Sequence, residues 1–216
     1  MVEYLYKDEF RTILREVENN PEAYLKEAQA LGQLEEVTDI GIGTDGNIVN
    51  LSYWNYWVRY DNIIAIGGGS QNGAYTGPIQ DGKIVGTVPQ YIYSEGKIFV
   101  VTEMEWVFTN NTELKIAPKL PDTVERLDRV FIGATSLETP CEIPSSVTSV
   151  RGIFQECTNL TGTITINSDV LEDYHEFLYN VGSEERPIVL KGTGNNLEIL
   201  EAIRLTGNSE YITIEQ

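Results

Sequence analysis

Three consecutive stretches of the chain repeat one pattern at a fixed spacing of 23 residues, beginning at Val101, Val124 and Val147. Aligned, they place matching residue types in shared columns: Phe108, Phe131 and Phe154; Leu114, Leu137 and Leu160; Met104, Leu127 and Val150; Val107, Val130 and Ile153; Leu120, Ile143 and Ile166; and a polar column of Thr112, Thr135 and Thr158. A repeat period of about 20 to 50 residues is typical of solenoids and similar arrays. The chain is therefore predicted to form stacked coils, whose extended surfaces usually bind partners.

Each repeat unit divides into an extended start, a turn and a second extended piece, as in residues 147–154, 155–160 and 161–166. We expect the second pieces of successive units to pair into a parallel ladder, with the phenylalanine and leucine columns inside. Prolines lie around this piece in the first two units only: Pro118, Pro121, Pro140 and Pro144. Because proline has no N–H to donate, the ladder should be interrupted in those units and regular in the third.

A weaker fourth copy follows the three clear repeats over residues 170–193. Val170 and Phe177 continue the spacing of 23, whereas Ile188 and Leu190 lie one residue later, which indicates one inserted residue. The strand pattern that starts at Asp81 is expected to cap the first coil. A short helix over 197–205 and a last strand over 211–215 are expected to cap the other end, because an uncapped coil would expose apolar surface.

The first third of the chain has a different pattern. Residues 1–18 and 21–31 predict two short helices, which would either pack on the next segment or dock the chain to a larger assembly. Residues 37–66 alternate with a period of two, with a hairpin turn at 44–47, and predict a small antiparallel sheet. The fold class is therefore α+β, with a head over 1–77, a glycine-rich loop at 67–73, and a capped solenoid over 78–216.

Six residues are candidates for a contact surface. Trp54, Tyr56 and Trp57 belong to an aromatic cluster that would either pack the sheet or stack on a sugar or a partner. Strict alternation would place Trp54 and Tyr56 on one face and Trp57 on the other. Trp106, Arg129 and Arg151 lie in the part of the repeat where residue types change, as an outer face allows. The partner is expected to be a protein or a glycan.

The formal net charge of −18 disfavours binding to nucleic acid or to an anionic membrane through charge. It favours solubility, with calcium sites or a basic partner as alternatives. No run of about 18 apolar residues is present, so no membrane insertion is expected. The charged start of the chain lacks the pattern of a signal peptide. This favours a virion or the cytoplasm over display on a cell surface.

Catalytic, cofactor and metal sites are not predicted. Cys141 and Cys157 occupy different columns and are expected to be free buried thiols, since a disulfide would need their Cα atoms within about 7 Å. Two cysteines and one histidine do not supply the four ligands of a zinc site. His175, the only histidine, has no nucleophile motif around it. We therefore expect the chain not to be an enzyme.

Residues 143–167, IPSSVTSVRGIFQECTNLTGTITIN, resemble the BspA-like family of leucine-rich repeats, whose unit is also about 23 residues long. The resemblance covers roughly residues 78–193 and is weaker where Asn111 and Ala134 replace the residue of the Cys157 type. It implies a curved leucine-rich solenoid without a catalytic motif. Members are mostly surface proteins that bind host or bacterial partners, and similar repeats occur in phage and prophage proteins of gut bacteria.

Together, these features predict a non-catalytic structural or recognition protein of a larger assembly. Its most concrete form is a phage virion or tail accessory protein, in which the head attaches and the solenoid presents a surface. The alternative is a soluble or surface-displayed adhesin-like module that binds a host protein or a glycan. A virion component should form a homo-oligomer or need a partner, whereas a free module should be a monomer.

Overall fold

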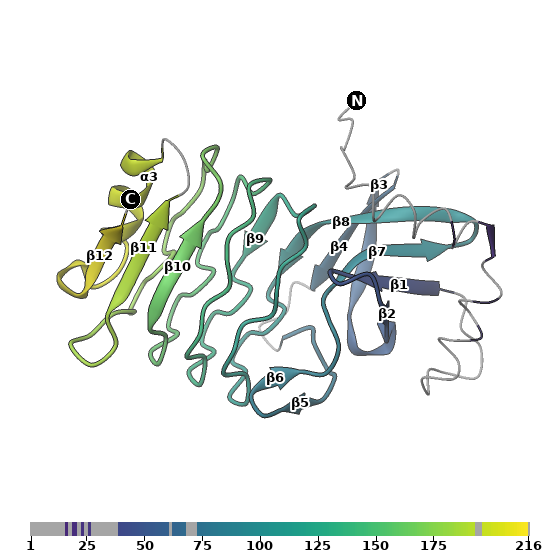
Figure 1. The fold of residues 1–216 in the computed structure, drawn as a ribbon, viewed down its shortest axis with the longest axis horizontal. Coiled ribbons are helices and arrows are strands. Elements are labelled where there is room, and N and C mark those ends of the chain that lie inside the picture. The colour runs from purple at the N-terminus through teal and green to yellow at the C-terminus, as the bar shows by residue number, and fades with distance from the viewer. Residues whose placement is uncertain are drawn as a thin grey trace.

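The computed structural model describes residues 16, 19, 20, 23, 26, 39–60, 62–67, 73–192 and 196–215. Over these ranges the chain is mostly β-structure, with a β-solenoid of about four stacked coils and one α-helix near its C-terminal end (Figure 1). The solenoid and the antiparallel pairing in residues 39–67 confirm those parts of the predicted fold class. The two helices predicted within residues 1–31 lie outside the described residues, apart from five single positions.

A seven-stranded sheet occupies the N-terminal side of the described chain, in the order β2-β1-β7-β8-β4-β3 with β9 paired to β8. Its strands are β1 Asp39–Gly43, β2 Ile48–Val49, β3 Tyr56–Tyr60, β4 Ile63–Gly67, β7 Pro89–Ser94, β8 Lys97–Glu105 and β9 Arg126–Asp128. The hairpin predicted around residues 44–47 is confirmed, because β1 and β2 pair antiparallel across it. The sheet joins strands from both sides of the predicted boundary at residue 77, which itself stays a prediction.

The seven-stranded sheet is strongly curled. Tyr56 on β3 donates its hydroxyl hydrogen to a carboxylate oxygen of Asp39 on β1, at 2.5 Å. Three strands lie between these two, so a flat sheet would hold them about 19 Å apart. Burial of the phenol and its hydrogen bond to Asp39 raise the pKa of Tyr56 well above its ordinary value. The short helix η1, Leu51–Tyr53, carries the chain from β2 to β3.

Two parallel ladders run along the solenoid. The first continues the seven-stranded sheet from β4 through β8 and β9 to single bridges at Ser149 and Asp173. The second contains β10 Gly162–Ile166, β11 Ile188–Gly192 and β12 Ile212–Glu215, all parallel. In the first two coils it shrinks to the bridges Ile116–Thr139 and Ile143–Ile166. This confirms the prediction that proline interrupts the ladder in the first two repeats and not in the third.

The aligned apolar columns form the core of the solenoid. Phe108, Phe131 and Phe154 are buried and stacked, with ring centroids 5.3 and 5.6 Å apart and interplanar angles of 6° and 9°. The leucine column is fully buried as well. Backbone hydrogen bonds join successive coils beside the rings, as from the Phe131 amide to the Ile153 carbonyl at 3.0 Å. The predicted columns are confirmed, and the threonine column faces solvent.

The predicted register of the fourth coil is wrong at its start. Val170 is 51 % exposed, and the neighbouring Leu171 takes the buried place that the repeat spacing assigned to Val170. The Phe154 amide donates to Phe177, whereas the Phe131 amide donates to Ile153. Phe177 therefore lies in the column of Ile153, and its ring meets that of Phe154 edge-on at 72°.

The end of the fourth coil contains more inserted residues than the sequence indicates. Ile164 pairs with Leu190, 26 residues later, rather than with Ile188. The extra residues form a tight turn in which Ser183 and Arg186 pair antiparallel. A turn outside the ladder accommodates an insertion at little cost, because loops tolerate added length. The degenerate repeat therefore keeps its place in the stack.

Both ends of the second ladder are covered. A hairpin of β5 Ile79–Gln80 and β6 Lys83–Ile84 lies at the first coil, where the Gly82 carbonyl accepts from two amides of residues 115 and 116. At the other end, α3 Leu197–Arg204 buries Leu200 and Ile203, and η2 Ser209–Tyr211 leads into β12. These elements agree with the predicted caps. None of the described helices is long and apolar enough to cross a membrane.

Candidate binding face

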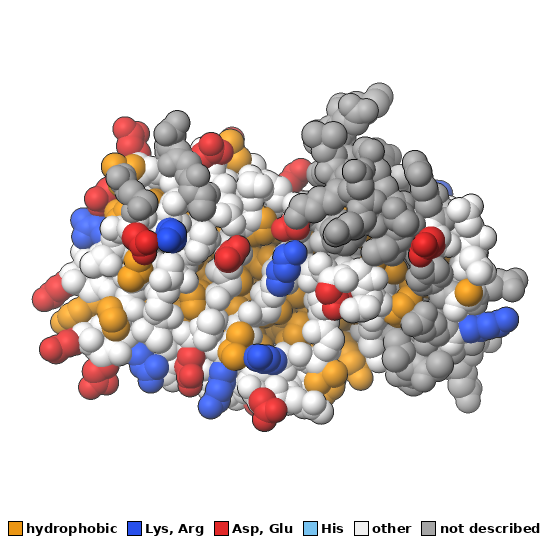
Figure 2. Space-filling view, viewed as in Figure 1, with side chains coloured by type: hydrophobic (Ala, Val, Ile, Leu, Met, Phe, Trp, Pro, Cys, Tyr) orange, Lys and Arg blue, Asp and Glu red, His pale blue; other side chains and the backbone are white. Residues whose placement is uncertain are grey.

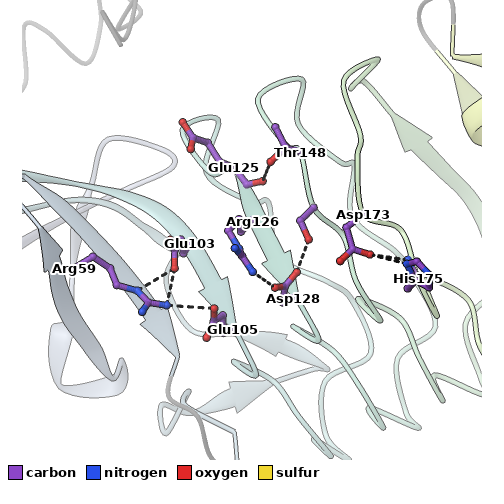
Figure 3. A network of polar contacts seen from close by, with 10 residues as sticks. Arg59, Glu103, Glu105, Glu125, Arg126, Asp128, Thr148, Asp173 and His175 are labelled. Carbon is purple, nitrogen blue, oxygen red and sulfur yellow. Dashed lines mark hydrogen bonds and ion pairs between the residues drawn. The ribbon is translucent and has the colours of Figure 1, made fainter. Parts of the chain in front are cut away.

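The outer side of the first ladder carries two rows of residues, most of which have polar or charged side chains. Side chains alternate along a strand, so Met104, Leu127 and Val150 point into the core while their neighbours point outward. Following the strand register, one row contains Trp57, Ala65, Glu103, Arg126, Ser149 and Asp173, and the other contains Gly67, Glu105, Asp128, Arg151 and His175. We call these two rows, with Arg59, the charged face (Figure 3).

Small residues on β4 let an arginine reach across the sheet. The Arg59 guanidinium lies 2.8 Å from Glu103 and 3.4 Å from Glu105, and it also covers one face of the Trp57 indole at 5.2 Å. Ala65 and Gly67 lie on β4 between these groups. Only glycine fits at position 67, where φ is 126° and a Cβ would come within 1.8 Å of the Glu105 carbonyl oxygen.

Asp128 is the centre of the next group along the charged face. Its carboxylate accepts from Arg126 at 2.7 Å and from the Ser149 hydroxyl at 2.6 Å, and its side chain is 13 % exposed. The hydrogen bond to Asp128 raises the pKa of Arg126 above its usual value. The half-exposed Arg126 is thereby held in one orientation, with other N–H groups left to face a partner.

A turn beside the charged face holds a tryptophan and an arginine together. Trp106 and Arg129 both have left-handed backbones, with φ of 57° and 54°, and Gly152 and Glu176 repeat this conformation in the next coils. The Arg129 guanidinium lies 5.1 Å from the centre of the Trp106 ring and 3.5 Å from Glu176. A cation over an indole is attracted by the ring quadrupole. The turn therefore presents Trp106 and Arg129 as one unit.

Arg151, Asp173 and His175 complete the face at its C-terminal side. Asp173 accepts from the His175 amide and contacts its Nδ1, each at 3.1 Å. Burial opposes the shift, but these hydrogen bonds and the nearby Arg151 lower the pKa of Asp173 overall. The exposed Arg151 forms no ion pair within the described part of the chain. It is the cation on this face that is most available to a partner.

The structure separates the six predicted contact residues into two groups. Trp57, Trp106, Arg129 and Arg151 lie on the charged face or at its edge. Trp54 does not reach the surface: it is 5 % exposed and packs against Tyr75 and Phe108, with ring centroids 4.7 and 6.0 Å away. The half-buried Tyr56 turns inward to Asp39. Curling of the sheet encloses both side chains, and the sequence pattern does not reveal this curling.

Several residues of the charged face are not among those predicted: Arg59, Glu103, Glu105, Arg126, Asp128 and Ser149. Most of them follow the repeat, because Glu103, Arg126 and Ser149 are spaced by 23 residues, as are Glu105, Asp128 and Arg151. These columns have no shared residue type, so an alignment that looks for similarity passes over them. Arg59 lies outside the repeat, and only the pairing of β4 with β8 brings it to Glu103.

The thiols and the acidic groups do not form a reactive or metal-binding centre among the described residues. Cys141 and Cys157 are both free and buried, and Cys157 contacts the Phe131 carbonyl oxygen at 3.0 Å. Burial raises the pKa of Cys141 to about 12 and that of Cys157 further still, so both thiols stay protonated at neutral pH. Within the ranges that the structure describes, no three acidic, histidine or cysteine side chains are arranged to hold a metal ion.

Comparisons with protein-family models, with curated proteins and with solved structures gave no significant match. The charged face is therefore interpreted from its own geometry. It combines fixed arginines, partly exposed tryptophans and half-buried carboxylates on consecutive coils. Arginine and tryptophan are residue types that are enriched at protein interfaces.

Proposed function

We propose that this chain is a non-catalytic recognition and structural protein that binds a protein partner through the charged face, within a larger assembly. The observation that supports this most is the row of arginines that carboxylates hold in place: Arg59 on Glu103 and Glu105, and Arg126 on Asp128. Arginine and tryptophan are the residues that most often dominate the binding energy of protein interfaces. Side chains that are already ordered lose less conformational entropy when a partner binds.

The alternation of charges on the charged face favours a specific protein partner. Arg126 and Arg151 alternate along the coils with Glu103, Asp128 and Asp173. A surface of this kind attracts a partner with the complementary arrangement and repels one whose charges are out of register. A uniformly charged surface would attract any opposite charge instead.

A glycan ligand is the alternative, as part of an adhesin-like module. Sugars stack on open aromatic faces, and the tryptophans at this site are Trp57 and Trp106. A guanidinium already covers one face of each indole, from Arg59 and from Arg129. The geometry therefore favours a protein over a sugar.

The kind of assembly is suggested by the repeat sequence alone. Residues 143–167 resemble BspA-like leucine-rich repeats, of the type also found in phage proteins, and this makes a virion or tail accessory protein the most concrete version. If the chain is such a protein, it should form a defined oligomer or need a partner to become ordered. Light scattering after size exclusion measures this directly, and a 24.2 kDa monomer would favour the free binding module.

The test of the charged face is a selection of binding peptides. A display library of random peptides is selected on the wild-type chain, and each selected peptide is then measured on Arg126→Ala/Arg151→Ala and on the control Lys83→Ala/Lys97→Ala, which removes the same charge elsewhere. We expect the first variant, and not the control, to weaken binding at least about tenfold. Equal binding of every selected peptide to both variants would contradict the role of the charged face.

The glycan alternative has its own measurement. A glycan array is probed with the wild-type chain and with Trp57→Ala and Trp106→Ala. Retention of a glycan by the wild-type chain and its loss in either tryptophan variant would favour the adhesin-like module. Absence of glycan binding, together with peptides that depend on Arg126 and Arg151, would support the proposed protein partner.

A further inference from the structure

A second surface lies where proline interrupts the second ladder. The structure contains a pocket of about 340 Å³ at this place, and the residues that line it include Ala117, Pro118, Leu120, Cys141, Glu142 and Pro144. Figure 2 shows hydrophobic side chains exposed in the middle of this view, over the coils between β10 and the β5–β6 hairpin. We call this feature the proline pocket. Its residues belong to the second ladder, whereas the charged face is built on the first.

The proline pocket opens because two coils separate. Backbone hydrogen bonds between the first and second coils of this ladder end with the Ala117 amide, which donates to Thr139 at 2.9 Å. Beyond that point, no hydrogen bond in the described chain joins residues 118–121 to 140–144. The next pair of coils continues further, with bonds from Ile143 to Thr165 and from Asn167 to Ile143. Continuing the register of the first two coils, the next bonds would run from the Cys141 amide to the Ala117 carbonyl and from the Lys119 amide to the Cys141 carbonyl, and neither is formed. Pro118 and Pro140, whose rings fix φ, flank these positions.

The walls of the proline pocket are apolar. Ala117, Leu120 and Cys141 are 8 %, 2 % and 7 % exposed, and Pro144 is buried beside them. Because burial raises the pKa of Cys141 to about 12, its thiol is neutral at pH 7 and acts as a small hydrophobic group. A pocket of this size and lining suits one aliphatic side chain with part of its backbone.

The rim of the proline pocket has an excess of negative charge. Lys119 lies 3.5 Å from Asp122, so these two charges offset each other. Glu142 is exposed and has no ion pair within the described residues. The whole chain carries a net charge of −18, which attracts cations from a distance. A ligand for this pocket should therefore carry a positive charge beside its apolar group.

From these observations we infer that the proline pocket binds an extended segment of a protein partner, one that places an aliphatic side chain next to a lysine or arginine. The aliphatic side chain enters between the two coils and contacts Leu120 and Pro144. The neighbouring cation pairs with Glu142. The backbone of the segment bonds to groups of residues 118–120 and 140–142 that the adjacent coil leaves unpaired, in the manner of strand addition.

Two other occupants fit the pocket less well. A second copy of this chain would bring a further −18 of charge to an already acidic rim. A glycan would place hydroxyl groups against apolar walls, where they lose hydrogen bonds to water. Both are separate outcomes of the experiment below.

The experiment is an NMR titration of the ¹⁵N-labelled full chain with capped peptides up to millimolar concentration. The probe is acetyl-Gly-Arg-Leu-Arg-Gly-amide. One control peptide replaces leucine with serine, and another replaces both arginines with glutamate. We expect amide shifts at residues 117, 119, 120, 141 and 142 with the probe, and binding at least about tenfold weaker with either control.

A matched pair of variants locates the site. Glu142→Gln should weaken binding of the probe severalfold, whereas Glu138→Gln, an exposed neighbour in the same coil, should not. The variant Arg126→Ala/Arg151→Ala, on the charged face, should leave probe binding unchanged. The experiment therefore tests the proline pocket independently of the proposed role of the charged face. Both glutamate variants are surface changes that keep the fold, which circular dichroism checks.

The inference would be overturned by absence of amide shifts at residues 117, 119, 120, 141 and 142 at millimolar probe, by equal effects of Glu142→Gln and Glu138→Gln, or by dimers in light scattering that Ala117→Trp abolishes. The last result would assign the pocket to a second copy of the chain. Shifts caused by a neutral oligosaccharide in place of the peptide would assign it to a glycan.

Discussion

The two ladders of the solenoid share the same coils but differ in how they are built. The first is continuous in the early coils, where β4, β8 and β9 pair, and shrinks to single bridges at Ser149 and Asp173. The second is broken in the early coils and regular from β10 to β12. Between the second and third coils both ladders shrink to single bridges, Arg126–Ser149 and Ile143–Ile166, and backbone hydrogen bonds beside the phenylalanine rings also join these coils. The arginines and the prolines therefore lie on different ladders of the same coils.

The largest loss of stability is expected from a substitution in the hydrophobic core that both ladders share. Phe131 is fully buried between Phe108 and Phe154, so Phe131→Ala leaves a cavity in the stack. We expect the free energy of unfolding to fall by about 3 to 5 kcal/mol, measured by urea denaturation. Thr135→Ala, on the exposed threonine column, is the control and should change it by less than about 0.5 kcal/mol. A loss near that of the control would show that the stack does not depend on its central ring.

A smaller loss is expected from a change that affects the first ladder alone. Gly67→Ala places a Cβ against the backbone of Glu105. At Gly96 a Cβ would meet no atom, so Gly96→Ala measures only the cost of a left-handed backbone in a residue other than glycine. We expect Gly67→Ala to destabilise the chain by about 3 kcal/mol and Gly96→Ala by about 1 kcal/mol. Thermal unfolding compares the two. Equal shifts in Tm would mean that the close approach of β4 and β8 is readily relaxed.

The second ladder is tested at its C-terminal cap. Buried Asn196 donates to the carbonyls of Ile166 and Ser168, at 3.1 and 3.0 Å. Asn196→Ala leaves these carbonyls without that donor and should cost about 1 to 3 kcal/mol. Hydrogen exchange of the β10 and β11 amides should quicken, while that of β8 and β9 stays unchanged. Exposed Asn159, which donates to the Thr135 carbonyl, provides the control Asn159→Ala.

The difference between the ladders can be reduced by one substitution. Pro140 lies 23 residues before Thr163, which belongs to the regular strand β10. Pro140→Thr lifts the fixed φ of proline beside the gap and restores an N–H donor that faces the third coil near Thr161. It should change stability by less than about 1 kcal/mol in either direction, since losing proline also frees the unfolded chain. It should also narrow the proline pocket and weaken binding of the leucine peptide. Unchanged peptide affinity would show that Pro140 does not hold the coils apart.

The smallest effect concerns the end of the charged face. The pKa of Asp173 is lowered in the folded chain, so its contribution to stability is complete above the unfolded value of about 3.9 and is lost as the pH falls through the folded value. NMR titration of the carboxyl group should give a midpoint below 3.9 in the wild-type chain. His175→Ala should raise that midpoint, whereas Lys97→Ala should not. No change in His175→Ala would assign the shift to the backbone amide of residue 175 and to Arg151, which both remain in that variant.

Much of the core was predictable, because burial repeats with the coil. The phenylalanine and leucine columns, the break at the prolines and the end caps all follow from residue types at fixed spacing. The fourth coil was predicted less well. Two apolar residues are adjacent at each key position there, Val170 with Leu171 and Phe177 with Leu178. A spacing of 23 selects the first of each pair, whereas the structure places the second in the register of the repeat.

The candidate site was predicted only in part. Trp106, Arg129 and Arg151 were found because they lie in variable columns of the repeat. Arg59 was missed, because its carboxylate partners lie more than 40 residues away in the sequence. Trp54 was named as a contact candidate, with packing as the alternative, because an aromatic cluster looks the same in sequence whether its strand faces water or the inside of a curled sheet.

The sequence by itself determined the solenoid, its period and the residues of its core, since each of these depends on contacts between adjacent coils that repeat every 23 residues. The tertiary structure decided how the first ladder joins the head sheet, which arginine meets which carboxylate, and where two coils part to leave a pocket. These features depend on pairing between segments without a common period. Curling of the sheet and the path of the backbone bring these segments together, and neither can be predicted from a single stretch of the sequence.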